Sequence, residues 1–237
     1  MSILLFSLLV VLPLLAVTYG NRLCWGWRPF MGADAEVDLL IEQWENGPGF
    51  DDYFTFARNP DAIDRDLRRL GAAAVPELNE ILRHSPSSRK RQIAAQALGL
   101  IGPEAKAGVP ALIGALKDSD DLGLVQAAAA KSLGVMRNPE SLRLLVETIN
   151  HPIDRVRAAA TTAVSAFEEK DYVPLVVELL ENQKLGDNAR DRAVFLLSET
   201  ADVLRTRNLL EKIQATDTSP EVRVEAAKSL TTLRPKT

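Results

Sequence analysis

Four arginines recur at matching places in this sequence, and their type and spacing suit the binding of anions. The arginine fork of N–H donors fits a carboxylate or a phosphate in two parallel hydrogen bonds. A row of such forks predicts either an anion-binding track or a structural ladder that bonds to nearby turns. Carboxylates such as Asp154, Asp187 and Glu221 stand close to these arginines in the sequence, which favours the structural ladder. The four residues, called the repeat arginines from here on, are Arg91, Arg157, Arg190 and Arg223.

Other chemistry-bearing patterns are missing from the sequence. The two histidines, His84 and His151, lie far apart, and Cys24 is the single cysteine. There is no glycine-rich phosphate loop after a strand and no nucleophile with a neighbouring base. Beyond residue 56 the chain holds 26 basic and 25 acidic residues, a balance that argues against non-specific nucleic-acid binding. We therefore expect no catalytic residue, no cofactor, no metal and no nucleic-acid partner.

A short sequence phrase recurs along most of the chain and predicts the fold. Its copies begin at Val125, Val156, Ala189 and Val222, so the steps are 31, 33 and 33 residues. A period of this length is typical of stacked helical repeats, in which each repeat contacts only its neighbours. The sequence therefore predicts an all-α protein, an α-solenoid that winds as a superhelix.

Breaks at glycine, asparagine and proline divide each repeat into two helices. Small residues such as Ala94, Ala129 and Ala160 on the second helices let neighbouring second helices approach closely. The expected first helices are 73–83, 104–117, 139–150, 172–182 and 203–215, and the second helices that follow them are 87–101, 122–136, 154–167, 187–201 and 220–233, with one more helix at 61–70. About five helix pairs are thus expected, within a solenoid domain at 57–235.

The first segment, 1–20, is expected to be a signal anchor or a signal peptide. Residues 3–19 form an uncharged apolar run close to the minimum length that spans a bilayer. No basic residue precedes the run, while Arg22 and Arg28 follow it, so the positive-inside rule favours a single-pass membrane protein with a cytoplasmic C-terminal domain. The alternative is cleavage of the run as a signal peptide, which would give a secreted or periplasmic protein.

The second segment, 21–56, is rich in aromatic residues and is expected to be a juxtamembrane and capping segment. Val37, Leu40, Ile41 and Trp44 share one face of a helix expected at 35–45. Terminal repeats need a cover for their outer apolar face, so we interpret this helix as a cap. A patch that binds a partner protein is the alternative interpretation.

The repeated phrase resembles the HEAT repeat, in the short version named for phycobilisome lyases. The copy most similar to it is Arg91–Gly102, and the resemblance covers about 57–235. Repeat 4 departs from the pattern at Asp191, Arg192 and Phe195, and Gln126 replaces the usual arginine. The resemblance implies a solenoid in which an arginine ladder joins the turns of adjacent repeats.

A solenoid without catalytic residues predicts a protein-binding scaffold or assembly module that holds its partner on the concave surface of the second helices. The alternative from another class is a bilin or tetrapyrrole lyase-like enzyme, or its chaperone subunit. A further alternative is a secreted or periplasmic binding module. The expected partners are therefore another protein and, through residues 3–19, a membrane. The residues expected to contact the partner protein are Arg89, Lys90, Gln96, Lys131, Arg155 and Arg192.

Overall fold

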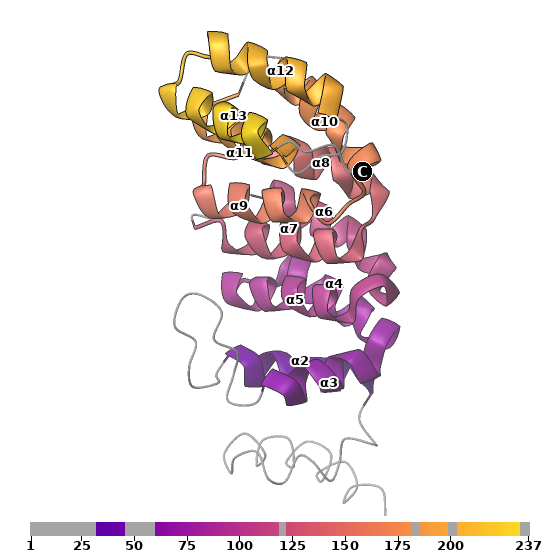
Figure 1. Ribbon diagram of the computed structural model, residues 1–237. Coiled ribbons are helices and arrows are strands. Elements are labelled where there is room, and N and C mark those ends of the chain that lie inside the picture. The colour runs from indigo at the N-terminus through magenta and orange to yellow at the C-terminus, as the bar shows by residue number, and fades with distance from the viewer. Residues whose placement is uncertain (1–31, 46–59, 119–121, 182–184, 199–202, 233–237) are drawn as a thin grey trace, which may run out of the picture.

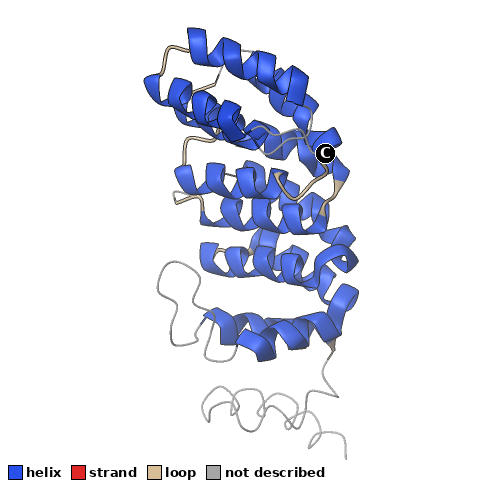
Figure 2. Cartoon of the chain, viewed as in Figure 1, coloured by secondary structure: helices blue, strands red, loops and turns tan. Residues whose placement is uncertain are grey.

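The computed structural model describes residues 32–45, 60–118, 122–181, 185–198 and 203–232. Within these ranges every regular element is a helix, as the uniform blue ribbons of Figure 2 show. The helices form one elongated stack with α2 at one end and α12 and α13 at the other (Figure 1). The expected all-α solenoid is therefore confirmed.

Five helix pairs build the solenoid in the described residues. The first helices are α4 (Val75–His84), α6 (Val109–Lys117), α8 (Pro139–Thr148), α10 (Glu169–Glu181) and α12 (Val203–Thr216). The second helices are α5 (Ser88–Ile101), α7 (Leu124–Met136), α9 (Asp154–Val164), α11 (Asp187–Ser198) and α13 (Pro220–Thr232). Two further helices, α2 (Ala33–Glu45) and α3 (Pro60–Leu70), precede the first pair.

Glycines and prolines place the ends of several helices. The short 3₁₀ helices η3 (Gly71–Ala74) and η4 (Gly102–Gly108) lead into α4 and α6, so these two first helices begin later than the sequence indicates. Pro76 and Pro110 lie in the first turns of α4 and α6, where the missing N–H leaves no helical hydrogen bond unmade. The 3₁₀ segments therefore act as the connections between one repeat and the next.

Polar side chains cap several of the helices. Ser87 accepts a hydrogen bond from the backbone N–H of Lys90, and Asn138 accepts one from that of Glu140. Asp154 begins α9 at its first helical position and makes no cap bond, since the N-cap residue is Ile153. The carboxylate of Asp154 instead forms the ion pairs described below.

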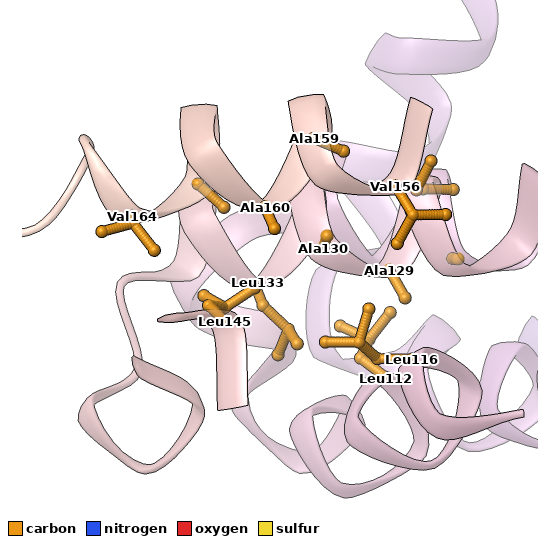
Figure 3. Close-up of a cluster of buried hydrophobic side chains, with 14 of the residues drawn as sticks. Leu112, Leu116, Ala129, Ala130, Leu133, Leu145, Val156, Ala159, Ala160 and Val164 are labelled. Carbon is orange, nitrogen blue, oxygen red and sulfur yellow. The ribbon is translucent and has the colours of Figure 1, made fainter. Parts of the chain in front are cut away.

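Second helices α5, α7 and α9 pack along a seam of very small residues. A methyl group on Gly134 would lie 2.6 Å from the Cα of Ala163, so only glycine fits there. Ser132 fills the space beside Gly99 and donates a hydrogen bond of 2.7 Å to the carbonyl of Ala95. Figure 3 shows the small side chains of α7 and α9 together with the leucines of α6 and α8 that complete this core.

The seam changes between α9 and α11. The contact between these two helices is much smaller than those of α5 with α7, α7 with α9, and α11 with α13. In α11 the position two residues after the repeat arginine holds Arg192, where α7 and α9 have the buried residues Ala128 and Ala159. On the α9 side, Ser165 stands where α7 has Gly134. Arg192 is larger than the alanines at this position, and α11 and α13 slope relative to the helices below them (Figure 1).

Helix α2 packs against α3, α4 and α5 at the beginning of the stack. Its side chains Val37, Leu40, Ile41 and Trp44 are buried, so the predicted apolar face is confirmed. Glu45 at its end accepts a hydrogen bond from Ser87 and lies 3.6 Å from the ammonium group of Lys90. These contacts hold α2 over the first helix pair, in the position that a cap requires.

Among the described residues, none of the helices combines the length and the apolar character needed to cross a membrane. The apolar run of residues 3–19, the rest of segment 1–20 and Cys24 lie outside the described residues.

Candidate functional site

The second helices expose apolar side chains to solvent, which makes their outer surface the candidate binding site. Four large hydrophobic residues are exposed in the described part of the chain, and three of them, Val135, Phe195 and Val224, lie on α7, α11 and α13. The fourth, Leu122, lies in the turn before α7. We call the exposed surface of α5, α7, α9, α11 and α13 the second-helix face.

The exposed apolar residues stand on separate second helices, and a partner that covered them would remove apolar surface from water. The side chain of Phe195 is 49% exposed although it is a large aromatic residue. It occupies the position five residues after the repeat arginine, where the neighbouring second helices carry Thr162 and Lys228. A partner with apolar groups can therefore gain free energy by covering it.

The six expected contact residues all lie on second helices, but the structure gives them different roles. Lys131 is exposed, while Arg89 and Gln96 are half-buried. Several of the six make contacts within the chain. Lys90 faces Glu45 of the cap, Arg155 donates to the carbonyl oxygen of Leu122 at 3.2 Å, and Arg192 lies 2.7 Å from the carboxylate of Asp154.

These contacts give Arg155 and Arg192 a part in the solenoid itself. The bond from Arg155 connects α9 to the turn before α7, and the ion pair from Arg192 connects α11 to α9. A charge reversal at either residue would therefore disturb the packing of repeats as well as any partner contact. Lys131, Val135 and Phe195 are better probes of the second-helix face, because their side chains reach solvent.

Local burial and charge shift the pKa values of Lys131 and Asp191 on this face. Lys131 reaches solvent, yet enough of it is buried beside its neighbours to lower the pKa of its ammonium group. Burial also raises the pKa of Asp191, and the negative charge of Glu225 adds to that effect. The second-helix face thus holds charged groups that are partly removed from water, and a partner could compensate them.

The repeat arginines bond to the turn that joins the two helices of their own repeat. Arg91 donates to the carbonyl of Ser85 at 2.8 Å, and Arg223 donates to that of Asp217 at 2.6 Å. Arg157 donates to the carbonyl of His151 at 2.8 Å, and Arg190 to that of Leu185 at 2.6 Å. Each guanidinium therefore holds the turn of its repeat against the beginning of the second helix.

Gln126 performs the same task in the repeat that lacks the arginine. Its side-chain amide donates to the carbonyl oxygen of Asp118, in the turn before α7. Gln126 is buried, so an amide in place of a guanidinium avoids the cost of burying a charge. Although glutamine replaces arginine in this repeat, the turn before α7 still receives a side-chain hydrogen bond.

Arg190 alone among the repeat arginines bonds to the next repeat in the described residues. Its Nε and Nη2 donate to the two carboxylate oxygens of Asp217 at 2.9 and 3.0 Å. The expected ladder that joins the turns of adjacent repeats is therefore found at this one junction. The other three arginines bond within their own repeats, because their best-placed acceptors are the carbonyls of their own turns.

Sequence reasoning passed over Val135, Val224 and Asp217. Aligning the repeats on their arginines would have helped, because this register places Phe195 and Val224 at positions where other second helices carry polar or small residues. The same alignment places Asp217 six residues before Arg223. There it can bond to Arg190, the repeat arginine of the preceding repeat. The signal was thus present in the comparison of repeats with one another.

The described residues contain no group of three or more histidine, cysteine, aspartate or glutamate side chains placed to hold a metal ion. Several surface carboxylates are engaged by basic groups, as Asp154 is by Arg157 and Arg192.

The stacked helix pairs and their repeated turn arginines define an α-solenoid repeat protein. The family model for HEAT repeats matches residues 75–165 and 109–198, which together make up more than half of the chain. The chain therefore belongs to the HEAT repeat family.

Several solved structures are similar to this chain, and two of them are described here. One is the complex of CpcE and CpcF of phycocyanin lyase from Nostoc sp. PCC7120, with 19% identity, a TM-score of 0.47, and coverage of 66% of this chain and 98% of that chain. The other is an engineered protein, with 20% identity, a TM-score of 0.45, and coverage of 83% of this chain and 96% of that chain. Among curated proteins none matches the sequence.

Proposed function

We propose that this protein is a non-catalytic scaffold that binds another protein on its second-helix face. The observation that carries the proposal is the exposure of Val135, Phe195 and Val224 on that face. Each lies on a second helix, at a position where its side chain fills no part of the solenoid core. Their contact with water is unfavourable, and a partner that covers them removes that cost.

The opposite surface supports this choice of face. The first helices expose charged pairs such as Arg143 and Glu178, which join α8 to α10 at 3.2 Å. Such a pair contributes little free energy to binding, because water solvates both charges well. A partner therefore gains more on the second-helix face than on the first helices.

The proposal also includes a membrane tether. The apolar run of residues 3–19 supports it by its length and its lack of charge, and Arg22 and Arg28 favour a cytoplasmic solenoid. A tether raises the local concentration of the scaffold at the membrane. Alkaline extraction of membranes should leave the full-length chain in the pellet. A mature chain whose intact mass lacks the first 20 residues would contradict the tether and support the secreted or periplasmic alternative.

Site-specific photo-crosslinking tests the scaffold proposal in the full-length chain. A photoreactive amino acid is placed at Val135 or Phe195, and matched controls carry it at Asn208 or Gln214, which are exposed on α12. We expect one partner protein to be crosslinked from both second-helix positions and from neither control position. Equal yields from the two sets, or no crosslinked protein from either, would overturn the proposed face.

The lyase-like alternative makes a different prediction. Co-expression with a bilin and an acceptor apoprotein would then change the visible absorption spectrum of the acceptor. The scaffold proposal expects no change that depends on this chain.

A further inference from the structure

A polar cavity of about 470 Å³ lies at the turn edge of the solenoid, between repeats 3 and 4. Asn150, His151 and Arg157 line it from the turn before α9 and from α9 itself. Gly186, Asn188 and the carboxylate-bearing Asp187 line it from the beginning of α11. The cavity lies at the turn end of α9 and α11, and Val135, Phe195 and Val224 are not among its lining residues, so what it binds goes beyond the proposed scaffold function.

Arg157 reaches this cavity with part of its hydrogen-bonding capacity unused. The residue is 9% exposed, and its Nε is buried without an acceptor among the described residues. Its Nη1 donates to the carbonyls of His151 and Pro152, both at 2.8 Å, and its Nη2 lies 3.1 Å from Asp154. A buried N–H without an acceptor is costly, and an added acceptor would remove that cost.

The next repeat shows which group fits there. Arg190 bonds its own turn carbonyl and the aspartate three residues before it, as Arg157 does. In addition its Nε and Nη2 hold both oxygens of Asp217, which comes from the turn of the following repeat. Asp217 lies six residues before Arg223, and the residue six before Arg190 is Lys184. The sequence therefore repeats no carboxylate at this position of the pattern.

We propose that the cavity binds a carboxylate group, which completes the guanidinium of Arg157 as Asp217 completes that of Arg190. The planar fork of arginine matches a carboxylate in two parallel bonds. The carboxylate of Asp187 is held by Arg190 at 2.8 Å, which turns part of its charge away from the cavity. The ligand is either a free small carboxylate or an acidic side chain of a protein.

The Nε–H signals of the arginines in an NMR spectrum test this site directly. Full-length protein labelled with ¹⁵N-arginine is kept in a mild detergent and titrated with acetate, and separately with an amidated peptide that carries one glutamate. We expect the Arg157 Nε–H signal to move downfield and to saturate. The Arg190 signal serves as the internal control and stays in place, because Asp217 already occupies its fork. Arg157→Lys assigns the signal by removing it.

The two arms separate the sources of the carboxylate. If acetate saturates the signal, a free small carboxylate is enough to fill the site. If only the glutamate peptide saturates it, the ligand is an acidic side chain of a protein. Chloride at equal ionic strength and a matched glutamine peptide are the negative controls. An Arg157 signal that stays unmoved by both probes, or moves equally with chloride, overturns the site.

A converse variant tests the analogy between the two repeats. Asp217→Ala removes the carboxylate from the fork of Arg190, so the Arg190 signal should then respond to acetate as that of Arg157 does. If the Arg190 signal of a folded Asp217→Ala protein ignores acetate, this fork does not select carboxylates and the assignment fails.

Discussion

Asp154 and Asp191 lie on neighbouring second helices, and their surroundings move their pKa values in opposite directions. The hydrogen bond from Arg192 lowers the pKa of Asp154, and the charges of Arg192 and Arg157 add to this effect. Burial raises the pKa of Asp191, and Glu225 adds to that rise. The fold therefore favours the ionised form of Asp154 and the protonated form of Asp191.

These two shifts predict pH effects of opposite sign on thermal stability. The contribution of Asp154 is present above the pKa of the unfolded chain, about 3.9, and is lost as pH falls through its lowered native value. Asp154→Asn should thus lower the Tm at pH 7, and the difference from the parent should shrink as pH falls below about 4.

The effect of Asp191 on stability depends on pH in the opposite direction. Its protonated form is the favoured one, so stability is lost as pH rises from about 4 through the raised native pKa. Asp191→Asn should raise the Tm at pH 7 and leave it unchanged at low pH. Thermal unfolding of both variants between pH 3 and 8 is the measurement. Curves of the same sign for the two variants would contradict the assigned environments.

At the scale of the elements, the second helices owe their close approach to single small residues. The backbone of α9 beside Gly134 leaves no space for a Cβ, whereas Gly114 on α6 has no neighbouring atom within 4 Å of that position. The two glycines therefore form a matched pair in which the same substitution has opposite consequences.

Gly134→Ala should destabilise the protein by about 1–3 kcal/mol, because α7 and α9 must separate to admit the methyl group. Gly114→Ala should stabilise it by about 0.5–1 kcal/mol, because alanine restricts the unfolded chain and favours the helix. Urea unfolding followed by circular dichroism measures both free energies of unfolding. A neutral effect of Gly134→Ala would mean that the seam is looser than the structure shows.

Element positions were largely predictable from the sequence, whereas side-chain partners were not. Breakers such as Asn138 and Gly102 act on their own neighbours in the chain, so their effect can be seen locally. The pairing of Arg192 with Asp154 joins residues 38 positions apart, and it depends on how one repeat is rotated onto the next. The period alone does not give that rotation. For this reason the helix pairs were predicted well, while the contacts that Lys90, Arg155 and Arg192 make within the chain were not.

At the scale of the whole molecule, the solenoid consists of two closely packed blocks that meet at the α9–α11 seam. In the block from α4 to α9, the second helices pack closely at Gly99 and Gly134. In the other block, α11 packs closely on α13. In a repeat protein each interface contributes its own term to stability, so a small interface separates regions of different stability.

Amide hydrogen exchange should therefore divide the chain at this seam. We expect the amides of α11, α12 and α13 to exchange together, with a lower free energy of opening than those of α5, α7 and α9. Mass spectrometry of peptides from the full-length protein measures both groups. One common opening free energy from α4 to α13 would show that the solenoid behaves as a single cooperative unit.

The bonding of Arg91, Arg157 and Arg223 to their own turns bears on how such a chain lengthens during evolution. A gene duplication that copies one helix pair carries the arginine and its turn carbonyls together, so the copy arrives with its turn already secured. The bond between Arg190 and Asp217 crosses a repeat boundary, and an insertion between α11 and α12 would part the two residues. A helix pair inserted at that point would therefore cost Arg190 its partner in the following repeat.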